Sequence, residues 1–393
     1  MKTEHRAMYL TEILLDAFLD TRRHTEMLCA PLETEDYVVQ PTEEVSPPKW
    51  HLGHTTWFFE EFILKPHARE YTFFDKDFSF VFNSYYETFG NRVVRANRGN
   101  LSRPSVKRIY AYRQHVTEAV QELFEHTADA SLWSLLEIGI NHEQQHQELL
   151  LTDIKYILGH NPLLPAYSEN IKEHPVAESK EQWFAFPAGI SEIGHEGNGF
   201  CFDNELGRHK VYLEPFEIAA NLVTNQEYMG FIKDGGYTRF DLWHAAGWDW
   251  VKQQKIKNPL YWHLIKDQWY NYTLNGLHPI DPDAPVTHIS YYEAFAYAQW
   301  KGMRLPTEFE WETAHSHFLW GLRWEWTESA YLPYPKFKKA EGALGEYNGK
   351  FMVNQKVLRG ASIATPAGHS RPTYRNFFHP HERWQYTGFR LAR

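Results

Sequence analysis

The segment of residues 140–153, INHEQQHQELLLTD, contains two histidines whose spacing suits a metal ion. His142 and His146 are four residues apart, so on a helix their side chains lie one above the other on the same face. Neutral imidazoles are good ligands for zinc, iron and copper. Gln145 would also face that way, whereas Glu143 would point about 100° aside. The pair predicts one half of a metal site, although an exposed helix with two polar histidines would have the same pattern.

A second segment, WHLGHTTWFFEEF at residues 50–62, offers a further ligand. His51 and His54 lie there at helical spacing among aromatic residues. A histidine in such a helix is either a buried side chain with satisfied hydrogen bonds or a metal ligand. Two facing helices, one with the HxxxH pair and one with a single histidine, would form a three-histidine site with open coordination positions.

The letters His-Glu-x-x-His also match the motif of zinc metalloproteases. That interpretation requires Glu143 as the general base and a third ligand further along the chain. The available side chains are His160, Glu169 and Glu173, at the end of the predicted helix or in a linker. A protease would also leave the second half of the chain without a role. A zinc metalloprotease is therefore a remote alternative.

The overall composition excludes several classes of function. The net charge of −10 gives no electrostatic reason to expect nucleic acid or an anionic membrane surface as a partner. No run of about 18 apolar residues could span a bilayer, and the amphipathic N-terminus does not resemble a signal peptide. The two cysteines in 393 residues indicate a reducing compartment. We therefore expect a cytoplasmic protein.

The character of the chain changes near residue 165. Apolar periodicity predicts helices over residues 6–28, 48–66, 103–126 and 130–158, which suggests a four-helix bundle. The irregular stretch between the second and third helices is long, and such loops are often functional. Later residues form short strand-like runs rich in Gly, Pro and Asn. We predict an α-helical domain at 1–165, a linker at 166–182 and an α+β domain at 183–393.

Both halves resemble known families. LCAPLETEDYVVQPTEEVSPPKWHLGHTTWFFEEF and NHEQQHQELLLTDI resemble the DinB-like iron-binding domain of the ergothioneine-type sulfoxide synthases, the EgtB family. LVTNQEYMGFI, APVTHISYYEAFAYAQWKGMRLPTEFEWE, VLRGAS and GFRLAR resemble the formylglycine-generating-enzyme fold, a C-type-lectin-like domain. Sulfatase activation, the other activity of that fold, needs a reactive cysteine pair, and RGASIATPAGHSRPTYRNFF contains no cysteine.

The resemblance implies a non-haem Fe(II) enzyme that uses O₂ to join a thiol to the imidazole ring of hercynine as a sulfoxide. The family's three iron-binding histidines match His54, His142 and His146, whereas His51 is not at a ligand position. A tyrosine hydroxyl would supply a proton during O₂ activation, and Tyr85 and Tyr86 resemble the tandem tyrosines of one branch of the family.

The family also implies where the substrates bind. Arg92 and Arg95 match an arginine pair that holds the carboxylate of the thiol substrate, a task that suits the guanidinium fork. Gln145, on the ligand face of its helix, is a candidate for a hydrogen bond to the imidazole-bearing substrate.

A loop near the C-terminus carries the remaining candidates. Asn376 matches an asparagine that helps to bind the histidine substrate, and the aromatic residues around it, Phe377 and Phe378 with Trp384 and Tyr386, could hold a trimethylammonium group. Some relatives have an acidic residue where Phe378 stands, which helps to bind γ-glutamylcysteine. Its absence favours free cysteine as the donor. A selenoneine- or ovothiol-type synthase on a related histidine substrate remains an alternative.

Overall fold

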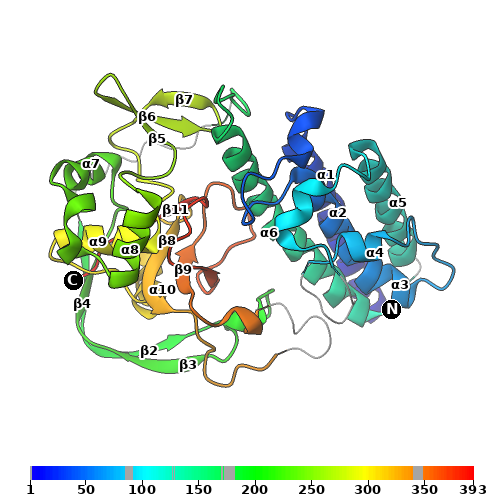
Figure 1. The fold of residues 1–393 in the computed structure, drawn as a ribbon. Coiled ribbons are helices and arrows are strands. Elements are labelled where there is room, and N and C mark those ends of the chain that lie inside the picture. Colours follow the sequence, from blue (N-terminus) through cyan, green and yellow to red (C-terminus); the bar gives the residue numbers. More distant parts are fainter. Residues whose placement is uncertain are drawn as a thin grey trace. The chain divides into compact units, whose positions relative to one another are not determined.

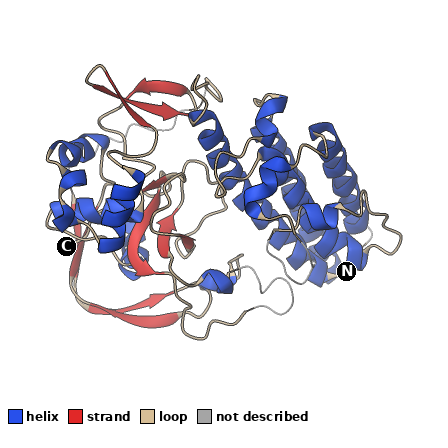
Figure 2. Cartoon of the chain, viewed as in Figure 1, coloured by secondary structure: helices blue, strands red, loops and turns tan. Residues whose placement is uncertain are grey.

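The computed structural model describes residues 2–84, 92–125, 127, 129–169, 171, 182–339 and 348–393. The chain divides into two compact units, Met1–Leu163 and Leu164–Arg393 (Figure 1). Within the described ranges, no helix is at once long enough and apolar enough to cross a membrane. The first unit is helical, and the second mixes helices with short strands (Figure 2).

Four long helices form the first unit, as the apolar periodicity predicts: α1 (Lys2–Cys29), α2 (Pro48–Phe59), α5 (Val106–Glu125) and α6 (Ala130–Gly159). Pro48 occupies the first position of α2, where its missing N–H costs nothing. Asp129 caps α6 by accepting a hydrogen bond from the backbone N–H of Ser131. Short elements join the long helices: η1 (Thr34–Val38), the π-helical turn η2 (Glu60–Leu64), α3 (Lys65–His67), α4 (Phe78–Val81) and η4 (Arg95–Asn100).

Helix α2 lies at the centre of this unit, since every one of its residues is buried. It packs against both α5 and α6. At Gly139 of α6, a Cβ atom would lie only 2.4 Å from the Phe59 ring of α2. The glycine therefore lets the two helices that carry the predicted metal ligands approach closely.

The second unit has an α+β architecture, as predicted. Its largest sheet has the strand order β10-β9-β8-β11, with bounds Asn376–Phe378, Lys356–Gly360, Trp324–Ala330 and Thr387–Gly388. Three smaller antiparallel sheets pair β1 (Trp183–Phe186) with β4 (Phe216–Ala219), β2 (Gly189–Ile193) with β3 (His209–Leu213), and β5 (Trp262–Ile265) with β6 (Gln268–Thr273) and β7 (Gly276–Pro279). The helices are α7 (Asn225–Lys233), α8 (Ala245–Gln254), α9 (Tyr291–Trp300) and α10 (Glu308–Ala314).

The start of the predicted linker packs on this second unit. The backbone N–H groups of Tyr167 and Ser168 both donate to the carbonyl of Leu274, and the Tyr272 hydroxyl donates to the carbonyl of Pro165. These bonds place the beginning of the second unit at Leu164, ahead of the first regular strand.

Candidate metal centre

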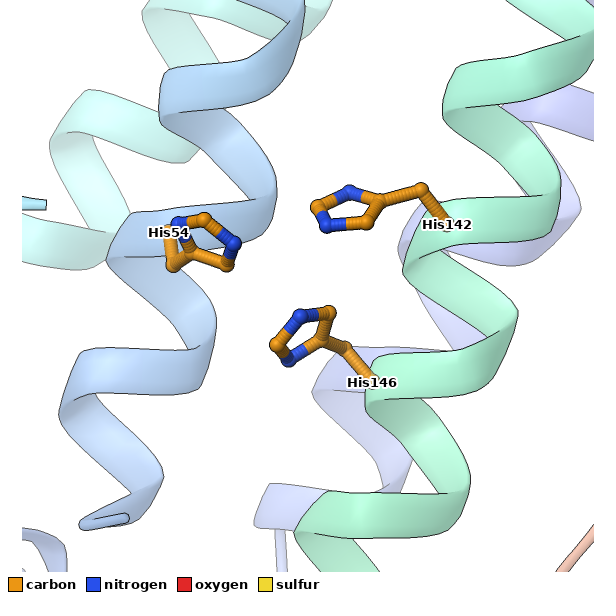
Figure 3. Close-up of side chains that lie close together, drawn as sticks. All are labelled: His54, His142 and His146. Atoms are coloured by element: carbon orange, nitrogen blue, oxygen red, sulfur yellow. The ribbon is translucent and has the colours of Figure 1, made fainter. Parts of the chain in front are cut away.

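Three histidines from two helices meet inside the first unit. His54 lies on α2, and His142 and His146 lie one turn apart on α6, so that the three imidazoles point toward one another (Figure 3). One nitrogen from each ring lies within 4.8 Å of the others. His54 and His142 are buried and His146 is half-buried. The structure thus brings together the three histidines that the sequence selects as ligands.

The hydrogen bond of His54 leaves one of its nitrogens available to a metal. Its Nδ1 lies 2.7 Å from the carbonyl oxygen of Phe82. A carbonyl can only accept, so Nδ1 carries the proton and Nε2 carries the lone pair. Metal-binding histidines are commonly oriented by a carbonyl or carboxylate in this way.

Burial favours the protonation state that binds metals. It lowers the pKa of His142 to about 4, and it lowers the pKa of His54 and His146 well below the usual value, with the other histidines adding to the effect at both. All three imidazoles are therefore neutral at neutral pH, which is the form that coordinates a cation. The donor set, its burial and its hydrogen bonding fit a zinc or iron ion.

His51 is close to this group but is not part of it. Its Nδ1 lies 2.9 Å from Nδ1 of His146, and its Nε2 lies 2.9 Å from a carboxylate oxygen of Asp153. Both ring nitrogens are therefore engaged with protein groups. This position agrees with the prediction that His51 is not a ligand.

The hydrogen bonds and ion pairs of Glu143 argue against the metalloprotease interpretation. Its carboxylate accepts hydrogen bonds from Arg22 Nη1 (2.9 Å), Arg113 Nη2 (2.9 Å) and Thr25 Oγ1 (2.7 Å), and its side chain has no exposed surface. Burial raises its pKa, but the two arginines outweigh burial and hold the pKa at about 2. A carboxylate held by two guanidinium groups is a poor general base, so Glu143 here neutralises two buried arginines, while the two histidines of the motif face the candidate metal site.

The predicted arginine pair is exposed. Arg92 and Arg95 both lie at the surface, and Arg95 donates to the backbone carbonyl of Glu44. Gln145 lies half-buried on α6, next to His146 in sequence. Tyr85 and Tyr86, the predicted proton donors, lie outside the described residues.

A third arginine that the sequence reasoning missed lies buried beside the histidines. Arg98 is 6% exposed, and its guanidinium carbon lies 3.3 Å from the centre of the Trp50 ring, which in turn stacks on His54 at 4.5 Å. It donates to the hydroxyls of Ser46 (2.8 Å) and Ser84 (3.1 Å).

Among the described residues, no carboxylate forms an ion pair with the buried guanidinium of Arg98. Its buried Nε also has no acceptor among them. Burial, together with the positive charges of Arg95 and Arg92, outweighs the negative charge of Asp153 and lowers the pKa of Arg98 well below the usual value. The sequence signal for it was the i, i+3 spacing after Arg95, within the segment VVRANRGN.

The C-terminal candidates lie together in the second unit, on strand β10. Asn376, Phe377 and Phe378 pair with residues 356–358 of β9. Phe377 stacks on Tyr331 with ring centres 4.1 Å apart, and Phe378 meets Trp384 edge-on at 5.7 Å.

An ion pair holds the start of this strand. Arg375 Nε and Nη2 donate to the two carboxylate oxygens of Glu308 at 2.8 and 3.0 Å, and both side chains are almost fully buried. The three candidate residues that follow are each half-buried. Their side chains therefore stand on a firmly anchored strand, where a small molecule could reach them.

Comparisons with known proteins agree with both halves of this architecture. Residues 17–150 match the model of the DinB superfamily, and residues 167–321 match that of the sulfatase-modifying factor enzyme 1-like domain. The chain is 29% identical to the hercynine oxygenase of Mycolicibacterium thermoresistibile, over 78% of this chain and 79% of that protein. It is 29% identical to the hercynine oxygenase of Mycobacterium tuberculosis, over 76% and 80%.

Another group of relatives matches a smaller share of the chain. The formylglycine-generating enzyme of Thermomonospora curvata is 30% identical over 42% of this chain and 58% of that protein. Such relatives match less than half of the chain, whereas the hercynine oxygenases match most of it. The chain is therefore an oxidative enzyme with the EgtB-type fused architecture, in which a DinB-like helical domain precedes a formylglycine-generating-enzyme-like domain.

Proposed function

We propose that the chain is an Fe(II)-dependent sulfoxide synthase that joins a thiol to the imidazole ring of hercynine, with O₂ as the oxidant. The observation that carries this proposal is the buried group of three neutral histidines, in a chain similar over most of its length to hercynine oxygenases. The reaction balances: a thiol, an imidazole C–H and O₂ give a sulfoxide and one water. Four electrons leave the two substrates and reduce O₂.

His54, His142 and His146 would hold the metal. Iron fits the reaction better than zinc, because zinc has no redox chemistry. When bound, Fe(II) would supply the electron transfer that O₂ requires and leave open positions for the substrates. The chain's own part is to keep the three imidazoles neutral, oriented and shielded from water. The burial of His54 and His142 and the hydrogen bonds of His54 and His146 support this role.

Arg98 is the strongest candidate for holding the carboxylate of the thiol substrate. Its buried guanidinium has no ion pair with the described residues, and it would gain a charge-assisted, bidentate partner when a carboxylate enters. Its stacking on Trp50, which stacks on His54, places it near the histidines. Arg92 and Arg95, at the surface, remain candidates for the same substrate and would attract its carboxylate during entry.

The other roles follow from residue chemistry. Tyr85 and Tyr86 are proposed as the proton donor and its support, because a phenol can give a proton where no stronger acid is present. Gln145 and Asn376 are proposed to bind the histidine-derived substrate. Phe378 offers an apolar ring where an acid would bind the amino group of a dipeptide, which favours free cysteine over γ-glutamylcysteine.

The proposal is tested by incubating the Fe(II)-loaded protein in air with hercynine or histidine and, in turn, cysteine, γ-glutamylcysteine or a selenium donor. Mass spectrometry should find the sulfoxide of cysteine and hercynine as the main product. A clear preference for the dipeptide would overturn the cysteine assignment, and a product on unmethylated histidine would identify an ovothiol-type enzyme. Peptide cleavage by a zinc-loaded protein, lost in Glu143→Gln, would overturn the whole proposal.

A further inference from the structure

Two side chains that are not metal ligands form a hydrogen-bonded line that ends on one of the ligands. Asp153 and His146 lie seven residues apart on α6 and so share a face of that helix. His51 reaches between them from α2, one turn before His54. The distances are 2.9 Å from Asp153 Oδ2 to His51 Nε2, and 2.9 Å from His51 Nδ1 to His146 Nδ1. His51 and Asp153 are 2% and 3% exposed, so water does not compete.

The chemistry of these atoms sets the direction of each hydrogen bond. The Asp153 carboxylate can only accept, so His51 Nε2 carries a proton. A neutral His51 then has a lone pair on Nδ1 and accepts from His146. His146 Nδ1 must therefore carry its proton, which leaves the lone pair of His146 on Nε2.

This tautomer matters because the other one would block coordination. If His51 carried its proton on Nδ1, two N–H groups would face each other, and His146 would have to move its own proton to Nε2. A protonated Nε2 cannot bind a cation. Asp153 is itself held in place, since the same oxygen accepts from the backbone N–H of Ser46 at 2.9 Å.

We propose that Asp153 and His51 are positioning residues that fix the tautomer and ring orientation of His146, so that its Nε2 is presented to the metal as a strong donor. Hydrogen bonding from a ligand imidazole to such a partner increases the basicity of its ligating nitrogen. The ligand His54 is instead oriented by a backbone carbonyl. Helices α2 and α6 thus supply the groups that orient His146, whereas Phe82, just after α4, orients His54.

The inference rests on the metal site of the proposed function, but its test measures metal binding without turnover. Co(II) is titrated into the metal-free full-length protein, and its visible spectrum reports affinity and ligand geometry. His51→Phe keeps a ring but removes both hydrogen bonds, and it should weaken Co(II) binding about 10–100-fold. His51→Asn places an amide oxygen where Nδ1 stands and can accept from His146, so it should restore binding to near the parent value.

Two further variants complete the test. His51→Gln places its amide at the position of Nε2, near Asp153, and so cannot accept from His146. It should weaken Co(II) binding about 10–100-fold, and it keeps the test decisive if His51→Phe does not fold. His115→Phe is the matched control, because His115 is a hydrogen-bonded histidine of α5 whose Nε2 contacts the carbonyl of Thr72, outside the metal centre. It should leave Co(II) affinity unchanged.

Equal Co(II) affinity and equal spectra in the parent, Phe and Gln proteins would overturn the inference. The inference would also be overturned if His51→Asn bound Co(II) as weakly as His51→Phe. A His51 that only fills space would not be replaced by an acceptor placed near His146, so Co(II) affinity would not recover. A protein with the expected order of affinities but no sulfoxide product would reject the proposed function and leave the positioning role intact.

Discussion

Replacing Glu143 by Gln separates a structural glutamate from a catalytic one. The variant keeps the shape of the side chain but removes the negative charge that pairs with Arg22 and Arg113. One guanidinium would then face an amide NH₂ in place of an acceptor. Both arginines are almost fully buried, so water cannot replace the lost partner.

The size of the effect follows from what each arginine retains. Arg113 keeps an ion pair with Glu26 at 3.3 Å. Among the described residues, the hydrogen bonds that remain to Arg22 go to uncharged groups, namely the hydroxyls of Thr56 and Thr117 and a backbone carbonyl. Removing one partner of a buried ion pair typically costs about 3–5 kcal/mol. Since one arginine remains paired, we expect the lower end, about 3 kcal/mol of unfolding free energy in the first unit.

Hydrogen exchange measures this loss in the helical unit alone, which matters because a two-unit chain need not unfold in one step. Core amides of α1 and α6 that exchange through unfolding of the unit should exchange about 100-fold faster in Glu143→Gln. Glu137→Gln is the control, because Glu137 is a half-buried carboxyl on the same helix whose pKa is raised by burial. Neutralising it should not increase exchange.

The same variant predicts a pH dependence. The pKa of Glu143 is depressed in the folded state, to about 2 from 4.5, so its stabilising contribution is fully present above about pH 4.5. It is lost as the pH falls towards 2. The stability difference between the parent and Glu143→Gln should therefore shrink over that range. Unchanged exchange rates at neutral pH, combined with loss of activity, would refute a structural role and point to a catalytic one.

Changes at a glycine, an arginine and the two tyrosines test the site further. Gly53→Ala would place a Cβ 2.2 Å from the buried ring of Phe82, whose backbone carbonyl orients the ligand His54. The variant should lose about 1–3 kcal/mol of unfolding free energy and bind Co(II) more weakly. An unchanged melting transition in calorimetry and an unchanged Co(II) titration would contradict this packing. Arg98→Lys keeps the positive charge but loses the planar guanidinium that can bind a carboxylate with two hydrogen bonds. The KM for the thiol should therefore rise about 10-fold while the KM for hercynine stays unchanged. Thiol kinetics equal to those of the parent would show that Arg98 does not bind the carboxylate of the thiol. Tyr85→Phe or Tyr86→Phe should shift the product from sulfoxide towards cysteine sulfinic acid while oxygen uptake continues. If both single variants and the double variant form sulfoxide at the parent rate, the proton donor is a different residue.

Local patterns in the sequence were enough to predict the long helices and the pairing of His142 with His146, whereas the choice of His54 over His51 as the third ligand came from the family resemblance. The spacing of His142 and His146 fixes their common face, because a helix repeats every 3.6 residues. Apolar periodicity located all four long helices. The π-helical turn after α2 has no such periodic signal, and the sequence predicted a continuous helix there.

Local sequence patterns do not predict contacts between residues that are far apart in the chain. The bond between His51 and Asp153 joins residues 102 positions apart, and it depends on the relative register of two helices, which periodicity does not determine. The same holds for Glu143, whose two arginines come from α1 and α5. Arg98 was missed for a related reason, since its burial depends on a stack with Trp50 that no local pattern reveals.

The most direct test of the account follows the oxygen atom into the product. The Fe(II)-loaded parent protein and His54→Ala are each supplied with cysteine, hercynine and isotopically heavy dioxygen, and the products are analysed by mass spectrometry. The account predicts a sulfoxide from the parent that carries one heavy oxygen atom, and no sulfoxide from the variant, which should also lose its iron. Full sulfoxide formation by His54→Ala, or an unlabelled product from the parent, would contradict the claim that these three histidines hold the iron for O₂-dependent C–S bond formation.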